Sequence, residues 1–225
     1  MLVMDQAGHM KTKDKILEVS LELFSQRGVS TVSVRDIAAA VGVRESALYR
    51  HFPSKQAVFD ELLENYLKQS KAFMSSIRAQ PTKDPYEMAQ TAGFYGQLTD
   101  EDFLRIGGSV FTEFLMQPDV LRFWRIMSIE RMNDKSLAAM WKQHLFEEPI
   151  AFQTELFRML IHSGEIKMAD PEIMALEFFS PLLLLYLHAL PFGPGSPETT
   201  YFLDFANRHM IHFRTVYSTK EAQTG

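Results

Sequence analysis

The 225-residue sequence predicts an all-α protein, with a small N-terminal domain followed by a larger helical domain. Three observations predict this fold class. Apolar residues recur at helical spacing, and Gly, Pro and capping residues separate the helical segments. No segment shows the alternation of apolar and polar residues that is typical of a strand, and no hairpin turn signal is present. The composition, 46% apolar and 23% charged, is that of a globular protein, and the length allows a sizeable core.

The first helix is expected over residues 11–26. Its Leu17, Leu21 and Phe24 are spaced i, i+4 and i+7, which places them on one face of a helix. Gly28 follows and is typical of the residue that ends a helix.

Two short helices are expected next, over residues 34–41 and 44–51. Ser33 is a good N-cap for the first, and Asp36, three positions later, completes a pair similar to a capping box. Gly42 can take a positive φ without a Cβ clash, so the second helix can cross the first. The segment therefore predicts two helices joined by a tight turn.

A proline stop and a long helix complete this N-terminal pattern. Pro53 ends the second short helix, and Ser54 caps a helix expected over residues 55–77. Leu48 and Phe52 are expected to pack inward. Several polar or aromatic residues stay available outside: Arg44, Ser46, Tyr49 and Arg50. This is the order of a helix-turn-helix, whose short polar helix suits a B-DNA major groove about 12 Å wide.

Seven more helices are expected after a connector flanked by Pro81 and Pro85. Several begin with an acid or hydroxyl residue followed by proline or an apolar run, as helix N-termini do. The only low-complexity piece is the 191–197 loop between the last two helices. The expected helices cover residues 86–98, 102–116, 120–132, 137–146, 149–162, 171–190 and 197–217.

The residues around the helix-turn-helix are more specific than the motif alone. They are Leu23-Phe24, Gly28, Ser33-Val-Arg-Asp-Ile-Ala38, Val41-Gly-Val43, Ala47-Leu-Tyr-Arg-His-Phe52 and Ser54-Lys55. With them, the chain resembles the tetracycline-repressor-like (TetR) family of transcriptional regulators, continuously from about residue 13 to residue 63. Residues 164–166 and 170–171 are similar, more weakly, to the family's joint before its last two helices.

The resemblance implies an all-helical homodimer. Its helix-turn-helix DNA-binding domain would cover residues 10–55, and its ligand-binding and dimerisation domain residues 56–225. In the family the last two helices, here about 171–190 and 197–217, form a four-helix interface with the second subunit. The implied function is that of a cytoplasmic, ligand-responsive repressor that binds a palindromic operator in double-stranded DNA.

Other functions remain open at this point. An activator, or a regulator that recruits a protein partner, would keep the same DNA-binding head. A helical carrier or enzyme is a further alternative, but no residue pattern requires it. The sequence contains no nucleophile elbow, phosphate-binding Gly loop or paired-carboxylate spacing, so no enzymatic activity is expected.

The resemblance also implies which residues touch DNA. Tyr49 and His51 offer donors to phosphates and Lys55 a point charge, and such contacts position a protein. Arg44 can pair with guanine and Glu45 can accept from cytosine N4, because both stand at the start of the reading helix. The implied set is Ser33, whose helix can point its amides at a phosphate, with Arg35, Arg44, Glu45, Ser46, Tyr49, His51 and Lys55.

Each role has a plainer alternative. Glu45 can simply favour the dipole of its helix. Arg44 can contact a phosphate instead of a base, and Arg35 can be a solvated charge. Tyr49 can be a packing residue and His51 a helix C-cap.

The larger domain is rich in Met, Phe and Trp, most of which must form its core. A cavity lined by Met and Phe suits a bulky apolar or aromatic effector. By analogy with the family, the candidate lining residues are Phe111, Phe114, Trp124, Met127, Trp141 and Phe178. Five polar residues could contact a polar group of the ligand or, alternatively, form surface salt bridges: Glu113, Arg122, Arg125, Glu130 and His144.

Charge is unevenly divided along the chain. The net charge is −5, but residues 1–55 carry 8 Lys+Arg against 6 Asp+Glu, and the remainder carries 15 against 22. The average hides a slightly basic head, whose affinity for DNA would rest on a few phosphate contacts and fall steeply with salt. Cysteine is absent, which excludes disulfides, thiolate zinc sites and thiol redox sensing.

No cofactor or metal is expected. His209 and His212 are spaced i, i+3 and share a helix face, but no acidic ligand pattern stands near them. They are expected at the surface or in an interface.

Two segments raise the question of targeting. Residues 173–192 are long and apolar enough for a membrane span, but Glu177 and Pro181 favour a buried or interface helix with a kink near Glu177. Residues 1–10 lack a cationic segment followed by an apolar core and do not resemble a signal peptide. Gly8-His9-Met10 resembles a cloning scar, so Met10 is the expected natural start.

Overall fold

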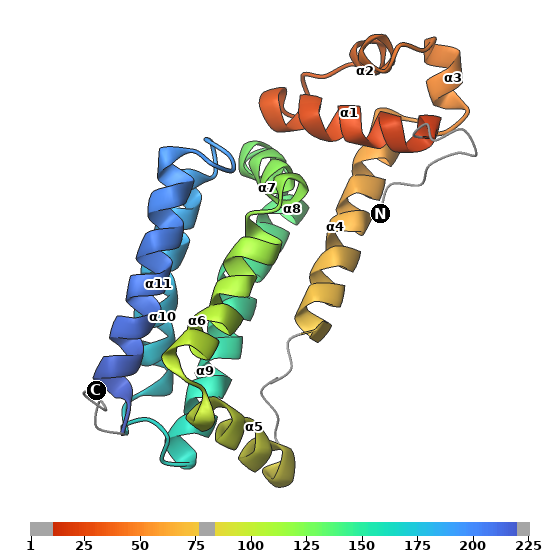
Figure 1. Cartoon of the computed structure of the whole chain (residues 1–225). Coiled ribbons are helices and arrows are strands. Elements are labelled where there is room, and N and C mark those ends of the chain that lie inside the picture. The colour runs from red at the N-terminus through yellow and green to blue at the C-terminus, as the bar shows by residue number, and fades with distance from the viewer. Residues whose placement is uncertain (1–10, 77–83, 220–225) are drawn as a thin grey trace. The chain divides into compact units, whose positions relative to one another are not determined.

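The computed structural model describes residues 11–76 and 84–219, and these residues are helical apart from turns and loops (Figure 1). Within these ranges the only β pairing is one isolated antiparallel bridge between Ile166 and Ser218. The all-α prediction is therefore confirmed. The expected start at Met10 and the connector around Pro81 lie outside the described residues.

The chain divides into two compact units. The first consists of Met1–Met74 with Pro118–Ala138, and the second of Ser75–Gln117 with Ala139–Gly225. The first compact unit is therefore larger than the DNA-binding domain expected over residues 10–55, because it also contains most of the helix α4 (Lys55–Ser76) and the segment Pro118–Ala138.

The first unit is built on a small apolar core. Ile16, Phe24, Ile37 and Leu48 are fully buried in it, and Phe52 nearly so, which confirms the inward packing expected of Leu48 and Phe52. The helices of this unit are α1 (Thr12–Arg27), α2 (Val34–Val41), α3 (Glu45–Tyr49), α4 (Lys55–Ser76, as far as Met74) and α7 (Pro118–Glu130).

The helix α7 belongs to this core although it is distant in sequence from the other helices. The rings of Tyr66 on α4 and Phe123 on α7 stack with centroids 4.2 Å apart, and Trp124 meets Tyr66 edge-on at 5.4 Å. Ile126 and Met127 are fully buried beside them. Since α7 also packs against α1, it connects α1 and α4, the two long N-terminal helices of the first unit.

The second unit is a helical bundle in which α10 packs against α9 and α11, while α11 also packs against α6. The rings of Phe157, Phe178 and Phe213 meet between α9, α10 and α11, with centroids 5.0 to 5.8 Å apart. The helices are α5 (Pro85–Gln97), α6 (Asp100–Ser109), η1 (Val110–Leu115), the end of α8 (Lys135–Lys142), η2 (Gln143–Glu147), α9 (Glu148–His162), α10 (Pro171–Ala189) and α11 (Pro197–Tyr217).

One predicted helix boundary in this unit is wrong. The break expected between residues 146 and 149 is a π-helical turn, η2, and the chain runs through it from α8 into α9 without interruption. Pro149 stands in the first turn of α9, where its missing N–H is tolerated. The helix expected over 102–116 is present from Asp100 to Leu115, and its last part, η1, is π-helical.

By length and composition, α10 is the one helix of the described chain that could cross a membrane. It packs instead on α9 and α11 and buries residues such as Met174, Ala175 and Leu182. The helix continues through Pro181 up to Ala189.

Candidate DNA interface and effector cavity

The N-terminus of α2 is capped by its own side chains. The Asp36 backbone N–H donates to Ser33 Oγ at 3.1 Å, and the Ser33 backbone N–H donates to Asp36 Oδ2 at 2.8 Å. The predicted capping box is thereby confirmed. Hydrogen bonds from Ser33, first from its backbone and then from its side chain, hold the pKa of Asp36 below its usual value, and Arg27 and Arg35 add to this.

Gly42 makes the turn between the two short helices. It has φ +82° and ψ 31°, and its N–H donates to the carbonyl groups of Ala38 and Ala39 at 3.0 and 3.2 Å. A residue with a Cβ is strained in this left-handed conformation, although space for the Cβ itself exists. The prediction that Gly42 ends α2 and redirects the chain is confirmed.

The reading helix α3 presents polar side chains to solvent from a buried base. Leu48 is fully buried, whereas Tyr49 is 50% exposed. The exposure of Tyr49 disfavours the alternative that it only packs. The helix is shorter than expected, because Arg44 is the extended N-cap and Arg50 the C-cap. Most residues of the implied DNA set are exposed around it: Ser33, Arg35, Arg44, Glu45, Ser46, Tyr49 and His51.

Lys55 differs from the other members of that set. It is half-buried, and its ammonium group donates to the carbonyl groups of three residues in the turn between α1 and α2: Val29, Ser30 at 3.3 Å and Val32 at 2.6 Å. These bonds use the three donors of the ammonium group. Lys55 therefore holds the turn from which the helix-turn-helix begins, rather than extending into solvent.

Glu130 binds the same turn from α7. Its carboxylate Oε1 accepts from the backbone N–H of Val29 at 2.7 Å and of Ser30 at 3.4 Å, and the residue is only 9% exposed. From the sequence alone Glu130 is a candidate ligand handle or surface salt bridge, and this contact with the turn is not expected. No local signal could have shown it, because the partners are about 100 residues apart.

The other candidate handles also have partners or stand in solvent. Arg122 bonds to Glu18 at 2.8 Å and also reaches Glu22 and Asp119. Burial would lower the pKa of Arg122, but the hydrogen bond to Glu18 and the three nearby carboxylates raise it overall. His144 bonds to Glu148 at 2.6 Å, and Glu113 is exposed.

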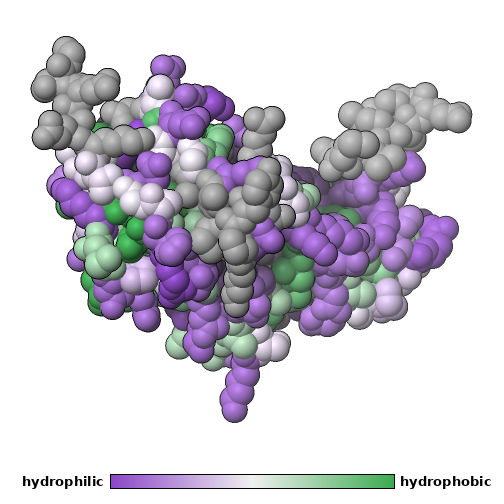
Figure 2. Space-filling view, turned by 90° about the horizontal axis from the view of Figure 1, so that it is seen from below, coloured by the Kyte–Doolittle hydropathy of each residue, from purple (hydrophilic) through white to green (hydrophobic). Residues whose placement is uncertain are grey.

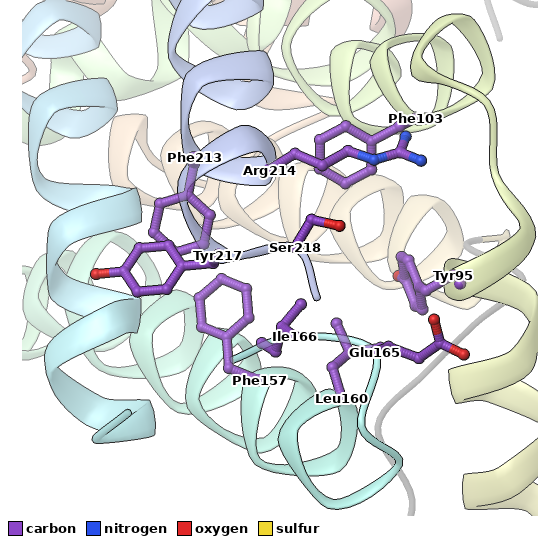
Figure 3. Close-up of a pocket in the computed structure, with 11 residues that line it drawn as sticks. Tyr95, Phe103, Phe157, Leu160, Glu165, Ile166, Phe213, Arg214, Tyr217 and Ser218 are labelled. Atoms are coloured by element: carbon purple, nitrogen blue, oxygen red, sulfur yellow. The ribbon is translucent and has the colours of Figure 1, made fainter. Parts of the chain in front are cut away.

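The second unit contains a mostly apolar cavity of about 80 Å³ between α5, α6, α9 and α11 (Figure 3). Phe157, Phe213 and Tyr217 line one side of it, and Tyr95 with Glu165 lines the other. Burial raises the pKa of Tyr95 to about 12, so its phenol is neutral at physiological pH. The cavity thus offers aromatic faces with a carboxylate at one edge.

Arg214 closes another side of the cavity. Its guanidinium lies 5.3 Å from the centroid of the Phe103 ring and donates to the Thr99 carbonyl at 2.9 Å and to the Leu98 carbonyl. These bonds fasten α11 to the segment that joins α5 and α6. A ligand bound beside Arg214 would therefore contact a point where α5, α6 and α11 are joined.

None of the six predicted ligand-lining residues lines this cavity directly. Phe178 comes nearest, since its ring meets the lining rings of Phe157 and Phe213. Phe114 and Trp141 are buried elsewhere, and of Phe111 only the backbone position in η1 is described. The remaining two, Trp124 and Met127, belong to the core of the first unit.

A second cavity, of about 380 Å³, lies in the first unit between α1, α4 and α7. Its lining includes four carboxylates: Asp14, Glu18, Glu61 and Asp119. It is therefore much less suited to an apolar effector than the cavity of the second unit.

The histidine pair does not converge on a site. His209 Nε2 lies 2.9 Å from the Phe178 carbonyl oxygen, and His212 is exposed. Within the described residues, no three His, Asp or Glu side chains are grouped as metal ligands would be.

The N-terminal helices match known regulators. Residues 16–62 match the family described as bacterial regulatory proteins, tetR family. Over 63 residues the chain is 38% identical to the HTH-type transcriptional repressor KstR2 of Rhodococcus jostii (strain RHA1). That match covers 28% of this chain and 31% of KstR2, so it spans less than a third of the relative's length.

The fold of the whole chain is also shared with solved structures. SmeT, the repressor of a multidrug efflux pump of Stenotrophomonas maltophilia, is 19% identical, with a TM-score of 0.59 over 94% of this chain and 92% of SmeT. A regulator from Saccharomonospora viridis in complex with choline is 16% identical, with a TM-score of 0.55 over 92% and 98%. At these identities the likeness establishes the fold alone. Residues 16–62 therefore carry the N-terminal helix-turn-helix domain of the bacterial tetR family of regulatory proteins, and the whole chain shares the all-helical fold of solved TetR-family regulators.

Proposed function

We propose that the protein is a homodimeric, ligand-responsive transcriptional repressor that works in the cytoplasm and binds a palindromic operator. One observation carries the DNA-binding part of this proposal. The base of α3 is buried through Leu48, while Arg44, Glu45 and Ser46 at its start are exposed. A short helix fixed in this way can enter a major groove with its first residues at the base edges.

The roles within the interface follow from position. Tyr49, His51, Ser33 and Arg35 would contact phosphates around the groove and set the position of the head. Arg44 and Glu45 would read bases, with Ser46 beside them. Lys55 would contribute through the turn that it holds rather than as an isolated point charge.

Dimerisation through α10 and α11 is supported by their exposed apolar side chains. Ile173, Leu176 and Leu184 are 53, 38 and 69% exposed on α10, and Tyr201 and Val216 are 53 and 43% exposed on α11. In Figure 2 apolar patches reach the surface on the side where Figure 1 shows these two helices. A two-fold axis through such a face would bury it and place two reading helices on successive half-sites about 34–36 Å apart.

The effector is proposed to be a small apolar or aromatic molecule that binds around Phe157 and Phe213, next to Phe178. Phe114 and Trp141 remain candidates for an enlarged site. The cavity of about 80 Å³ is far below the roughly 300–1,000 Å³ of drug-sized ligand sites. Binding would therefore have to move its walls. Among proteins of the same fold, SmeT is known in complex with triclosan and the S. viridis regulator with choline.

The DNA-binding part is tested by selection from a random pool of duplexes, which presupposes no operator. We expect the wild-type protein to enrich a palindromic sequence. Arg44→Ala should relax the preference at one base pair of each half-site, whereas Tyr49→Ala should weaken all duplexes evenly. Arg158→Ala, on the exposed face of α9, serves as the matched control that leaves both unchanged. Absence of any enriched sequence at low salt would contradict the proposal.

Repression is tested separately from DNA binding. A reporter under a promoter that carries the enriched sequence should rise when the gene is deleted. A fall would instead identify an activator, and the names of KstR2 and SmeT as repressors favour the first result.

A further inference from the structure

The turn between α1 and α2, residues 28–32, is held between two opposite charges. On one side Glu130 accepts from the N–H groups of Val29 and Ser30. On the other side Lys55 donates to the carbonyl groups of Val29, Ser30 and Val32. We call this arrangement the turn clamp. Both polar groups of the Val29 backbone are engaged in it, so the turn cannot shift without breaking charged hydrogen bonds.

The approach of Glu130 depends on a glycine. A Cβ on Gly28 would lie 2.8 Å from Glu130 Oε1 and 3.0 Å from Ile129 Cγ2. Gly28 also has φ +80°, where an L-residue is strained. Gly28 thus ends α1 and at the same time admits the end of α7 to the turn.

A second attachment lies eight residues earlier on α7. Arg122 bonds to Glu18 at 2.8 Å and to Glu22 at 3.2 Å, both on α1, and its side chain is only 17% exposed. Fixed at these two places, α7 must move together with α1 and with the start of the helix-turn-helix.

The segment that contains α7 is joined at both ends to the second unit. The segment Pro118–Ala138 belongs to the first unit, but its neighbours in sequence on both sides, Gln117 and Ala139, belong to the second. A rearrangement of the second unit that displaces Gln117 or Ala139 is therefore passed to this segment, and so to α7, through covalent bonds.

We propose that Glu130 is the positioning residue through which the ligand-binding half of the chain moves the DNA-reading helices. The proposal rests on the function proposed above. Displacement of α7 would pull the turn clamp and shift the start of α2, and with it α3. Glu130 itself does not touch DNA or effector; it acts through the Val29 and Ser30 amides.

The coupling can be measured without knowing the effector, because linkage is reciprocal. If the second unit acts on the head through Glu130, DNA bound to the head must act on the second unit through the same residue. Two methionines report on that unit from the inside: Met174 on α10 and Met210 on α11, each 1% exposed.

The experiment follows the methyl signals of Met174 and Met210 by NMR in the full-length protein, before and after saturation with the duplex enriched from the random pool. Each signal is assigned by a Met→Leu variant. Wild type is compared with Glu130→Ala, which removes the clamp, and Glu130→Gln, which keeps an acceptor oxygen but removes its charge. Asp119→Asn is the matched control, since it removes an acid of α7 that bonds to Arg122 and not to the turn.

We expect DNA to shift both methyl signals in wild type and in Asp119→Asn. In Glu130→Ala the DNA-induced shifts should fall below half while the protein stays folded by circular dichroism, and DNA affinity should drop about tenfold, or about 1.4 kcal/mol. The DNA-induced shifts and the DNA affinity of Glu130→Gln should lie between those of wild type and Glu130→Ala. This variant also tests the proposal if Glu130→Ala does not fold.

Equal DNA-induced shifts in wild type and the Glu130 variants would overturn the proposal, as would the absence of any shift in wild type saturated with DNA. Failure of the proposed function is a different result, because no duplex would then be enriched in the first place.

Discussion

The ammonium nitrogen of Lys55 lies 2.6 Å from the carbonyl oxygen of Val32, 23 residues earlier in the chain. The lysine that the family resemblance assigns to phosphate contact thus points into the turn of its own head. Lys55 therefore stabilises this turn, and a substitution of Lys55 should affect the stability of the helix-turn-helix as well as DNA binding.

Lys55→Met should destabilise the head by about 1.5–3 kcal/mol, the range for hydrogen bonds to charged groups. DNA affinity should fall for all sequences because α2 loses its fixed start. Thermal denaturation measures the stability and fluorescence anisotropy the affinity, with Lys15→Met, an exposed lysine of α1, as control. An unchanged melting temperature, with a salt dependence of binding reduced by about one unit, would restore the simple phosphate role.

Gly42→Ala should cost about 1–2 kcal/mol, because an L-residue with φ near +80° is strained even where its Cβ has room. Gly42→Asn should cost clearly less, since asparagine visits the left-handed region more readily. Denaturant unfolding of both variants checks this. Equal stability of Gly42→Ala and wild type would show that the turn can relax.

The capping box should contribute pH-dependent stability. The pKa of Asp36 is lowered on folding, so its contribution is fully present above the unfolded value near 3.8 and is lost as pH falls through the folded value. The difference in stability between wild type and Asp36→Asn should therefore persist at pH 6 and shrink below pH 4. A carboxyl ¹³C titration gives the pKa directly; a difference that stays constant from pH 6 to pH 3 would contradict this.

Leu184→Arg should convert the protein to a monomer. Leu184 is 69% exposed on the apolar face of α10, and a charge there cannot be buried against its symmetry copy. Met168→Arg is the matched control, because Met168 is even more exposed, at 90%, in the loop before α10. Light scattering after size exclusion distinguishes the two. A dimer that survives Leu184→Arg would place the interface elsewhere.

The head was predictable because its signals are local. Ser33 with Asp36, Gly42 and the buried Leu48 each lie within a few residues of the structure they determine. Local spacing also gave the bounds of α11 without error and those of α10 to within one residue.

The features that the sequence does not predict depend on contacts between distant residues, or on side chains that serve equally well in a core and in a ligand site. Glu130 meets its partners across about 100 residues. Aromatic and Met side chains have the same pattern in sequence whether they fill a core or line a cavity, so the sequence cannot distinguish Trp124 and Met127, buried in the first unit, from residues that line an effector site. The π-helical turn η2 before Pro149 cannot be distinguished from a break between two helices by the sequence pattern.

The central claim is that α3 reads DNA, and one measurement tests it most directly. The enriched duplex and a shuffled duplex of the same composition are each titrated with the protein and followed by fluorescence anisotropy. We expect saturation at two protomers per enriched duplex, an affinity at least 10³-fold above that for the shuffled duplex, and a steep loss of binding with salt. Equal affinity for the two duplexes, or no saturable binding at low salt, would contradict it.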